Sequence, residues 1–92
     1  MEKNKLSLTI NGIFCITGRG IVVTGRILEG HIRQGDKLTL TAPDKTMSTR
    51  CTLLEKFCKV VTEAEAGEYV GIRLSDIKRS DIQTGMRLVS DE

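Results

Sequence analysis

The sequence predicts an all-β domain, a barrel or a sandwich, from three observations. Apolar and polar residues alternate with a period of two in short runs, which is the pattern of half-buried strands. Glycines and other turn-forming residues separate these runs at short intervals. The runs do not alternate with helical segments, so a parallel sheet is not predicted, and the chain has no internal repeat. Many short strands between glycine turns are typical of barrels and sandwiches.

The N-terminal part contains three predicted strands. The first covers residues 6–10, where leucine and isoleucine alternate with serine and threonine, and the turn or bulge signal Asn11-Gly12 follows it. Residues 13–17 and 21–28 are rich in β-branched side chains and predict the second and third strands. Gly25 lies inside the third strand, where a glycine permits a positive φ or the close approach of another strand.

The segment Gly18-Arg19-Gly20, between the second and third strands, is the most informative motif. A phosphate-binding loop would need a helix after it, because the helix N-terminus faces the phosphate. The strand-like run Ile21-Val22-Val23-Thr24 follows instead, and the pattern GxxxxGK[ST] is absent, so we expect this chain to bind no nucleotide by that route. We predict a tight hairpin turn with Arg19 at its exposed tip, where it can contact a partner.

Glycine and proline turns separate the remaining strands. Glu29-Gly30 and Gln34-Gly35-Asp36 are turn signals, and residues 42–45 form a loop with the only proline. Residues 63–67 end in glycine and predict a connecting turn rather than a helix, whereas residues 75–84 include one short helical turn. The predicted strands lie at residues 37–41, 48–59 (one or two strands, extended by 60–61), 69–74 and 86–89, with Cys51, Leu53 and Phe57 facing inward.

The length and composition predict one intracellular domain. The 92 residues suffice for a single domain over 1–92, with a core over about 6–89 and short loose tails. No signal peptide is apparent at the N-terminus, and no apolar run approaches the ~20 residues that span a bilayer. Three cysteines without a CxxC pair favour reduced thiols over a disulfide framework. We therefore expect a cytoplasmic protein with no membrane partner.

The chemistry-bearing residues form no recognisable catalytic or metal-binding pattern. Structural zinc sites use close pairs such as C-x2–4-C, whereas Cys15, Cys51 and Cys58 are far apart, and His31 is the only histidine. No nucleophile–base pair with an orienting third group is apparent either. We expect no metal, no cofactor and no enzymatic activity, with the cysteines acting as small buried hydrophobic residues.

The charge pattern has two interpretations. The 14 Lys+Arg and 12 Asp+Glu residues give a net charge of +2 and are interleaved in the C-terminal half, as on an ordinary solvated surface. Alternatively, Arg19, Arg26, Lys59 and Arg73 form a small phosphate-contacting patch, if folding brings them to one face. Two phenylalanines and one tyrosine are too few for a module that reads single strands by stacking bases on several rings.

The sequence also resembles a known family. Taken in order over about residues 6–89, its blocks resemble the second domain of elongation factor Tu and related translational GTPases. The resemblance implies a small antiparallel Greek-key β-barrel of six or seven strands. In the complete factors this barrel packs against the GTPase domain, and together they hold the aminoacylated 3′ end of tRNA; in other members the barrel touches ribosomal RNA. The blocks are residues 14–26, Gly30, Gly35-Asp36-Lys37-Leu38, Ala66-Gly67-Glu68-Tyr69-Val70-Gly71 and Ile77-Lys78-Arg79.

The resemblance further implies where a partner would bind. Phe14, Ile16, Val22 and Thr24 match barrel positions that line the pocket for the terminal adenosine and its amino acid. Glu55 matches an acidic residue beside that adenosine. Together with two basic residues, they form the predicted RNA- or partner-binding set: Phe14, Ile16, Arg19, Val22, Thr24, Glu55 and Lys59.

The chain departs from the family at four positions. Asn11 stands where elongation factor Tu has an acidic residue, and Cys58 stands where the family usually has a pocket arginine. Tyr69 replaces a common asparagine, and Arg73 replaces an aliphatic residue. The loss of a pocket arginine removes charge-assisted hydrogen bonds to a ligand.

These departures leave two functions open. The chain has no P-loop and is too short for a GTPase domain, so we expect either an excised domain or a stand-alone relative. The first function is a translation-factor barrel that binds tRNA, ribosomal RNA or a GTPase domain. The alternative is a stand-alone barrel that binds another protein and has no role with RNA.

Overall fold

The computed structural model describes residues 5–16, 18 and 20–90. Within them the chain forms ten strands and a single 3₁₀ turn, η1. The strands are β1 (Ser7–Thr9), β2 (Gly12–Ile16), β3 (Gly20–Glu29), β4 (His31–Arg33), β5 (Lys37–Ala42), β6 (Lys45–Lys56), β7 (Lys59–Val61), β8 (Glu63–Glu65), β9 (Tyr69–Leu74) and β10 (Arg87–Ser90), and η1 covers Arg79–Asp81.

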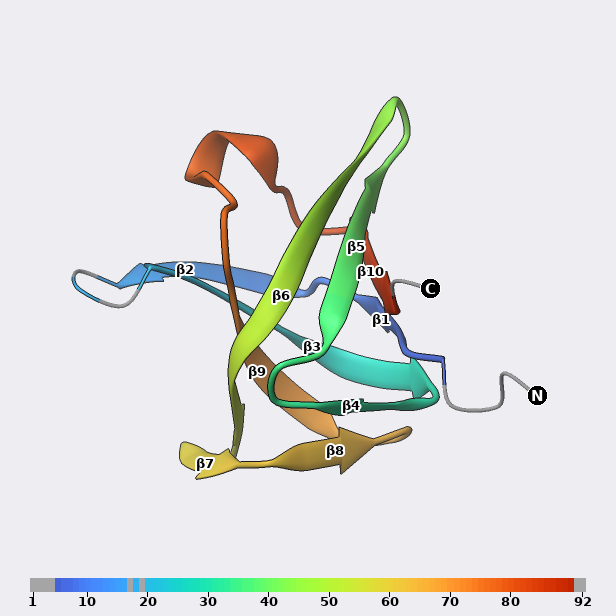
Figure 1. Cartoon of the computed structure of the whole chain (residues 1–92), viewed down its shortest axis with the longest axis vertical. Coiled ribbons are helices and arrows are strands. Elements are labelled where there is room, and N and C mark those ends of the chain that lie inside the picture. Colours follow the sequence, from blue (N-terminus) through green and yellow to red (C-terminus); the bar gives the residue numbers. More distant parts are fainter. Residues whose placement is uncertain (1–4, 17, 19, 91–92) are drawn as a thin grey trace.

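Six of these strands close into an antiparallel barrel. They follow one another in the order β1-β10-β5-β6-β9-β3, and the pairing of β1 with β3 closes the ring (Figure 1). Several neighbours, such as β3 and β9 or β5 and β10, are distant in sequence, as in a Greek-key barrel. Strand β2 extends the edge of β3, β7 pairs with β6, and β4 pairs with β8 in a separate ribbon. The all-β class and the six-stranded antiparallel barrel are therefore confirmed.

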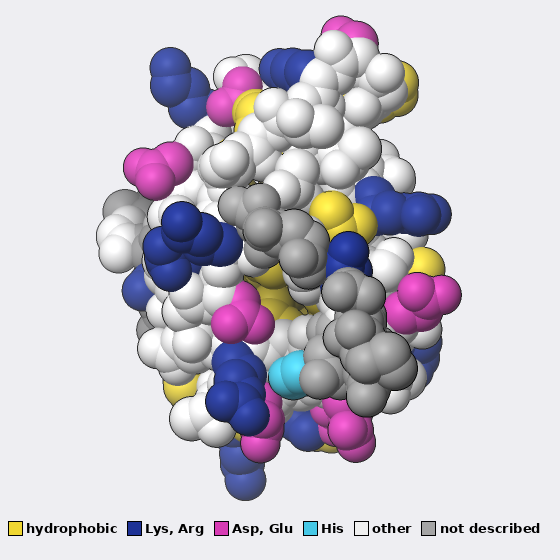
Figure 2. All heavy atoms as spheres, turned by 45° about the vertical axis from the view of Figure 1, so that its right-hand side comes forward, with side chains coloured by type: hydrophobic (Ala, Val, Ile, Leu, Met, Phe, Trp, Pro, Cys, Tyr) yellow, Lys and Arg dark blue, Asp and Glu magenta, His cyan; other side chains and the backbone are white. Residues whose placement is uncertain are grey.

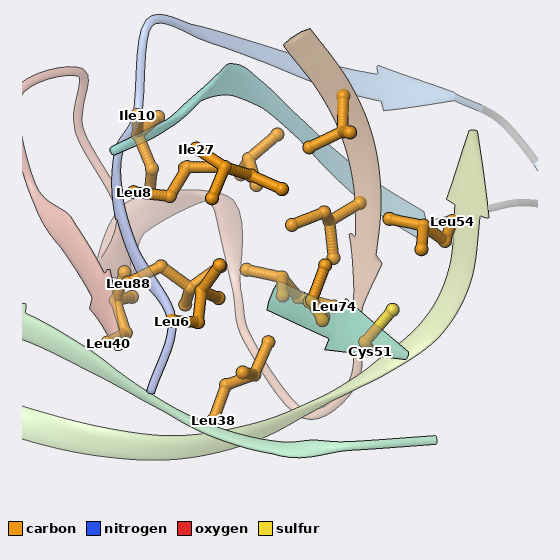
Figure 3. Packing of buried hydrophobic residues seen from close by; sticks show 14 of the residues in the cluster. Leu6, Leu8, Ile10, Ile27, Leu38, Leu40, Cys51, Leu54, Leu74 and Leu88 are labelled. Atoms are coloured by element: carbon orange, nitrogen blue, oxygen red, sulfur yellow. The ribbon is translucent and has the colours of Figure 1, made fainter. Parts of the chain in front are cut away.

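The barrel is filled by the inward side chains of alternating strand positions. In β3, β5 and β9, buried and partly exposed residues alternate strictly along most of the strand. Figure 3 shows these aliphatic side chains converging from opposite walls of the barrel. Removing this apolar surface from water is the main force that stabilises the fold. The largest fully buried side chains are Leu6, Leu8, Ile10, Val23, Ile27, Ile32, Leu38, Leu40, Leu54, Ile72, Ile82 and Leu88.

Gly25 permits the barrel to close between β1 and β3. A Cβ atom at this position would overlap the backbone carbonyl of Thr9 and lie 3.0 Å from Leu8 Cδ2. Its φ angle is not positive, so the requirement is space rather than backbone conformation. The close strand approach expected for Gly25 is confirmed.

The β2–β3 hairpin has the predicted glycine turn. Ile16 pairs with Gly20, and the φ angles of Gly18 and Gly20 are +81° and +87°, which L-residues rarely adopt. The hairpin projects to one side of the barrel (Figure 1). Arg19, the predicted tip residue, lies outside the described residues.

Several predictions about local structure are wrong. Residues 63–67 are not only a turn, because Glu63–Glu65 form strand β8 against β4. Phe57 does not face inward: it is 92% exposed and, with Cys58, forms the turn between β6 and β7 at positive φ angles of 52° and 63°. The loop predicted at residues 42–45 is shorter, since only Pro43 and Asp44 separate β5 from β6.

Leu53 and the cysteines also differ from expectation. The register of β6 shifts between Cys51 and Leu53, so Leu54, rather than Leu53, continues the inward face after Cys51. This β-bulge turns Leu53 outward. Cys51 is fully buried, as a small hydrophobic residue should be, but Cys15 and Cys58 are exposed thiols.

Candidate functional site

The outer surface of β2, β3, β9, β6 and β7 carries most of the predicted binding residues; we call it the outer face. These strands pair in that order. Their register aligns one row of residues across the whole face: Gly12, Thr24, Gly71, Glu55 and Val60. Because side chains alternate between the two surfaces of a sheet, this row points away from the core.

A second row runs parallel to the first, two residues along each strand. Phe14 in β2 pairs with Val22 in β3, which pairs with Arg73 in β9, and Arg73 pairs with Leu53 in β6. Phe14 is 53% exposed, whereas the other three are partly buried. The row therefore presents apolar side chains on both sides of one arginine.

Gly71 is the point where three predicted binding residues meet. A Cβ atom on Gly71 would lie 3.8 Å from Val22 Cγ1, 3.9 Å from Thr24 Cγ2 and 3.9 Å from Glu55 Oε1. Glu55 is partly buried, and its carboxylate has no hydrogen bond or ion pair within the described part of the chain. The centre of the face thus has partly exposed backbone at Gly71, with Val22 beside it and, at its edge, the carboxylate of Glu55, which has no partner among the described residues.

Near β2, the side chains of the outer face form polar contacts around Thr24. A Cβ atom on Gly12 would lie 2.7 Å from Thr24 Oγ1 and 3.4 Å from Phe14 Cε2, so the Phe14 ring lies against Gly12. The Tyr69 hydroxyl donates to Thr24 Oγ1 at 3.2 Å and accepts from Asn11 Nδ2 at 3.0 Å. Both partners can donate to a phenolate, and they lower the pKa of Tyr69 below 10.0, Thr24 more than Asn11. Asn11 and Tyr69, two of the positions expected to depart from the family, thus bond to each other.

The β-bulge in β6 positions the side chain of Arg73, which stands where an aliphatic residue is expected from the resemblance. Arg73 Nε donates to Thr52 Oγ1 at 3.1 Å, and the Thr52 hydroxyl donates to the Arg73 carbonyl oxygen at 3.1 Å. Thr52 is the residue at which the register shifts between Cys51 and Leu53. The bulge therefore places a hydroxyl where it fixes both the backbone and the guanidinium of Arg73.

The four basic residues proposed as a phosphate patch do not all share this face. Arg26 and Arg73 do, and Arg26 Nη1 donates to the Gly67 carbonyl oxygen at 2.7 Å. Lys59 is exposed but pairs with Lys56, one residue along from the pair of Glu55 with Val60, and so lies on the opposite side of its strand.

The remaining members of the predicted binding set are described only in part. The backbone of Ile16 belongs to β2, and its side chain is outside the described residues, as is Arg19. Sequence reasoning did not single out Gly71 or Thr52 as binding residues. A glycine inside the predicted strand at 69–74 was a signal for the first. Nothing in the sequence marks the second.

A separate polar hollow lies beside the β4–β8 ribbon. It has a volume of about 280 Å³ and is lined by charged residues with His31 and Ala64. Lys56 Nζ lies 2.5 Å from Glu68 Oε2, and this hydrogen bond lowers the pKa of Glu68. In Figure 2 the histidine is flanked by side chains of both charges, and both signs are interspersed over this side of the molecule.

Within residues 5–16, 18 and 20–90, no group of three His, Cys, Asp or Glu side chains could hold a metal ion. None of these residues belongs to a helix with the length and hydrophobicity of a membrane span.

The comparison with known families shows to which family this chain belongs. The family model for elongation factor Tu domain 2 matches residues 20–89, which is β3 to β10. The chain belongs to this family. The matched segment includes Val22, Thr24, Glu55 and Gly71 of the outer face, whereas Phe14 in β2 precedes it. As a member of the elongation factor Tu domain 2 family, the chain is a translation-related β-barrel module.

Proposed function

We propose that this chain is a non-catalytic module that binds the 3′ end of an RNA, with tRNA or ribosomal RNA as the source, on its outer face. The observation that carries the proposal is the meeting of Val22, Thr24 and Glu55 around Gly71. These residues come from three strands that are separated in sequence and adjacent in the barrel.

The chemistry of this face suits a single unstacked nucleotide. Gly71 adds no side chain, so a flat base can lie on the backbone beside the Val22 methyl groups. The carboxylate of Glu55, which has no partner within the described part of the chain, can accept hydrogen bonds from an exocyclic amino group or from ribose hydroxyls, including the 2′-hydroxyl that distinguishes RNA from DNA. The exposed ring of Phe14 offers one further stacking surface at the β2 edge.

A titration of the full chain with a single-stranded oligonucleotide ending in CCA tests the proposal, with two-dimensional ¹⁵N NMR at two salt concentrations. We expect saturable shifts at the amides of Val22, Thr24 and Gly71, and weaker binding at higher salt. Glu55→Gln should weaken binding, whereas the control Glu63→Gln, at an exposed position of strand β8, should not. An absence of saturable shifts at low salt would overturn the RNA role.

The module would work beside a GTPase domain or alone in the cytoplasm, where the exposed thiols of Cys15 and Cys58 would stay reduced.

A second candidate function is a protein-interaction barrel without an RNA role. It is favoured by the β6–β7 hairpin, where Phe57 is 92% exposed and Val60 is 60% exposed. Exposed aromatic side chains are frequent anchors of protein interfaces. A partner captured from nuclease-treated cells by the wild-type chain but not by Phe57→Ser would support this function. Recovery of ribosomes or tRNA in its place would count against it.

A further inference from the structure

Arg73 is a cation on the outer face whose side chain is held by one hydrogen bond but is paired with no acidic residue in the contacts described above. Its Nε is bonded to Thr52 Oγ1, which leaves the terminal nitrogens of the guanidinium available. Within the described part of the chain, no hydrogen bond from these nitrogens and no ion pair to Arg73 is formed. An arginine held in this way has lost much of its side-chain freedom before any ligand arrives, which lowers the entropic cost of binding.

The surroundings of Arg73 favour an anion attached to an apolar or aromatic group. In the register, Arg73 lies between Val22 and Leu53, two partly buried apolar side chains. Gly71 is the next outward residue on β9, about 7 Å along the strand, a span comparable with one nucleotide. Glu55 pairs with Gly71 rather than with Arg73, so the negative and positive groups occupy different rows.

We propose that Arg73, held in place by Thr52, forms a phosphate subsite, through which the outer face selects a nucleotide over the corresponding nucleoside. The terminal N–H groups of a guanidinium match two phosphate oxygens in a bidentate arrangement that an ammonium cannot reproduce. The inference rests on the proposed function, because it assigns the phosphate of the same bound RNA end.

Matched arginine variants of the full chain test the subsite. Arg73→Leu removes the guanidinium, whereas the control Arg87→Leu removes the same charge from an exposed position on β10, between Thr9 and Thr41. A third variant, Thr52→Val, keeps the charge of Arg73 and removes its anchor. The probes are adenosine, its 3′- and 5′-monophosphates and inorganic phosphate, titrated by NMR at constant ionic strength, with the spectrum of each free variant as the check on folding.

We expect the wild-type chain to bind one of the monophosphates about tenfold more tightly than adenosine. Arg73→Leu should abolish this preference while leaving the affinity for adenosine within about twofold, and Arg87→Leu should preserve it. Thr52→Val should give an intermediate preference, because the guanidinium keeps its charge but is no longer held.

Three results would overturn the subsite. If Arg73→Leu keeps the preference for the monophosphate, or Arg87→Leu loses it equally, the subsite is wrong although RNA binding stands. If inorganic phosphate binds as tightly as the monophosphate, the nucleotide assignment is wrong and Arg73 is a general anion site. If adenosine, its monophosphates and the CCA oligonucleotide all fail to bind the wild-type chain, the proposed function fails and the subsite fails with it.

Discussion

Gly71→Ala separates the role of the outer face in binding from any role in stability. The added methyl group would lie 3.8–3.9 Å from Val22, Thr24 and Glu55, which is ordinary van der Waals contact. Gly71 has no positive φ angle, so alanine adopts the same backbone conformation without strain. We therefore expect the free energy of unfolding to change by no more than about 0.5 kcal/mol.

The same methyl group should weaken RNA binding. It would stand between a base and the backbone surface on which we propose that the base lies. Stacking and contact of one base are worth roughly 1–3 kcal/mol, so an affinity loss of about tenfold is expected. Fluorescence anisotropy with a labelled CCA oligonucleotide measures the affinity. Urea denaturation followed by far-ultraviolet circular dichroism measures the stability, since the chain has no tryptophan.

Gly25→Ala is the matched control, because it changes the same residue type on the neighbouring strand β3. Its methyl group would overlap the carbonyl of Thr9 and press on Leu8, so β1 must move away from β3. We expect a destabilisation of roughly 1–3 kcal/mol. If Gly71→Ala binds RNA as well as the wild type does, the Gly71 surface is not the binding surface. If it destabilises the barrel as much as Gly25→Ala does, the described geometry is wrong.

Three further predictions concern titratable groups. Burial raises the pKa of Cys51 from 9.0 to about 11, so the thiol stays protonated up to a higher pH in the folded state than in the unfolded state. Stability should fall with rising pH between about 9 and 11, by roughly 1.4 kcal/mol per unit, and the fall should be smaller in Cys51→Ala under reducing conditions. Tyr69 is the only tyrosine, so its ultraviolet absorbance titrates it directly; we expect a midpoint below 10.0 that rises in Thr24→Val, and an unchanged midpoint would argue against the Thr24 contact. The hydrogen bond from Lys56 lowers the pKa of Glu68 below 4.5, so its stabilisation is present above about pH 4.5 and is lost as the pH falls through the lowered value. Glu68→Gln should therefore show a shallower loss of stability on acidification, and an identical acid profile would contradict this assignment.

The local structure of the barrel could be predicted because its determinants are local. The period-two pattern around Leu6 to Ile10, the strands on either side of Gly18 and the single helical turn after Leu74 depend on residues within a few positions of one another. Predictions from local patterns were wrong where a bulge or a turn interrupts the regular alternation of inward and outward side chains. The β-bulge after Cys51 reverses the side to which Leu53 points, and the turn at Phe57 uses φ angles that are usual for glycine or asparagine.

The binding site was predictable in part and only through the family resemblance. Val22, Thr24 and Glu55 were named from sequence, and the structure brings them to one face around Gly71. Lys59 was named as well, but its register with Lys56 places it on the other side of its strand.

The sequence by itself determined that this chain is an all-β barrel with a glycine hairpin and belongs with the second domain of elongation factor Tu. Only the tertiary structure decided that Asn11 and Tyr69 bond to each other, that Thr52 holds Arg73, and that Tyr69 and Arg73 share a face with Gly71. The reason is physical: strand formation follows from neighbours along the chain, whereas contacts across the sheet depend on register and bulges that many distant pairings fix together.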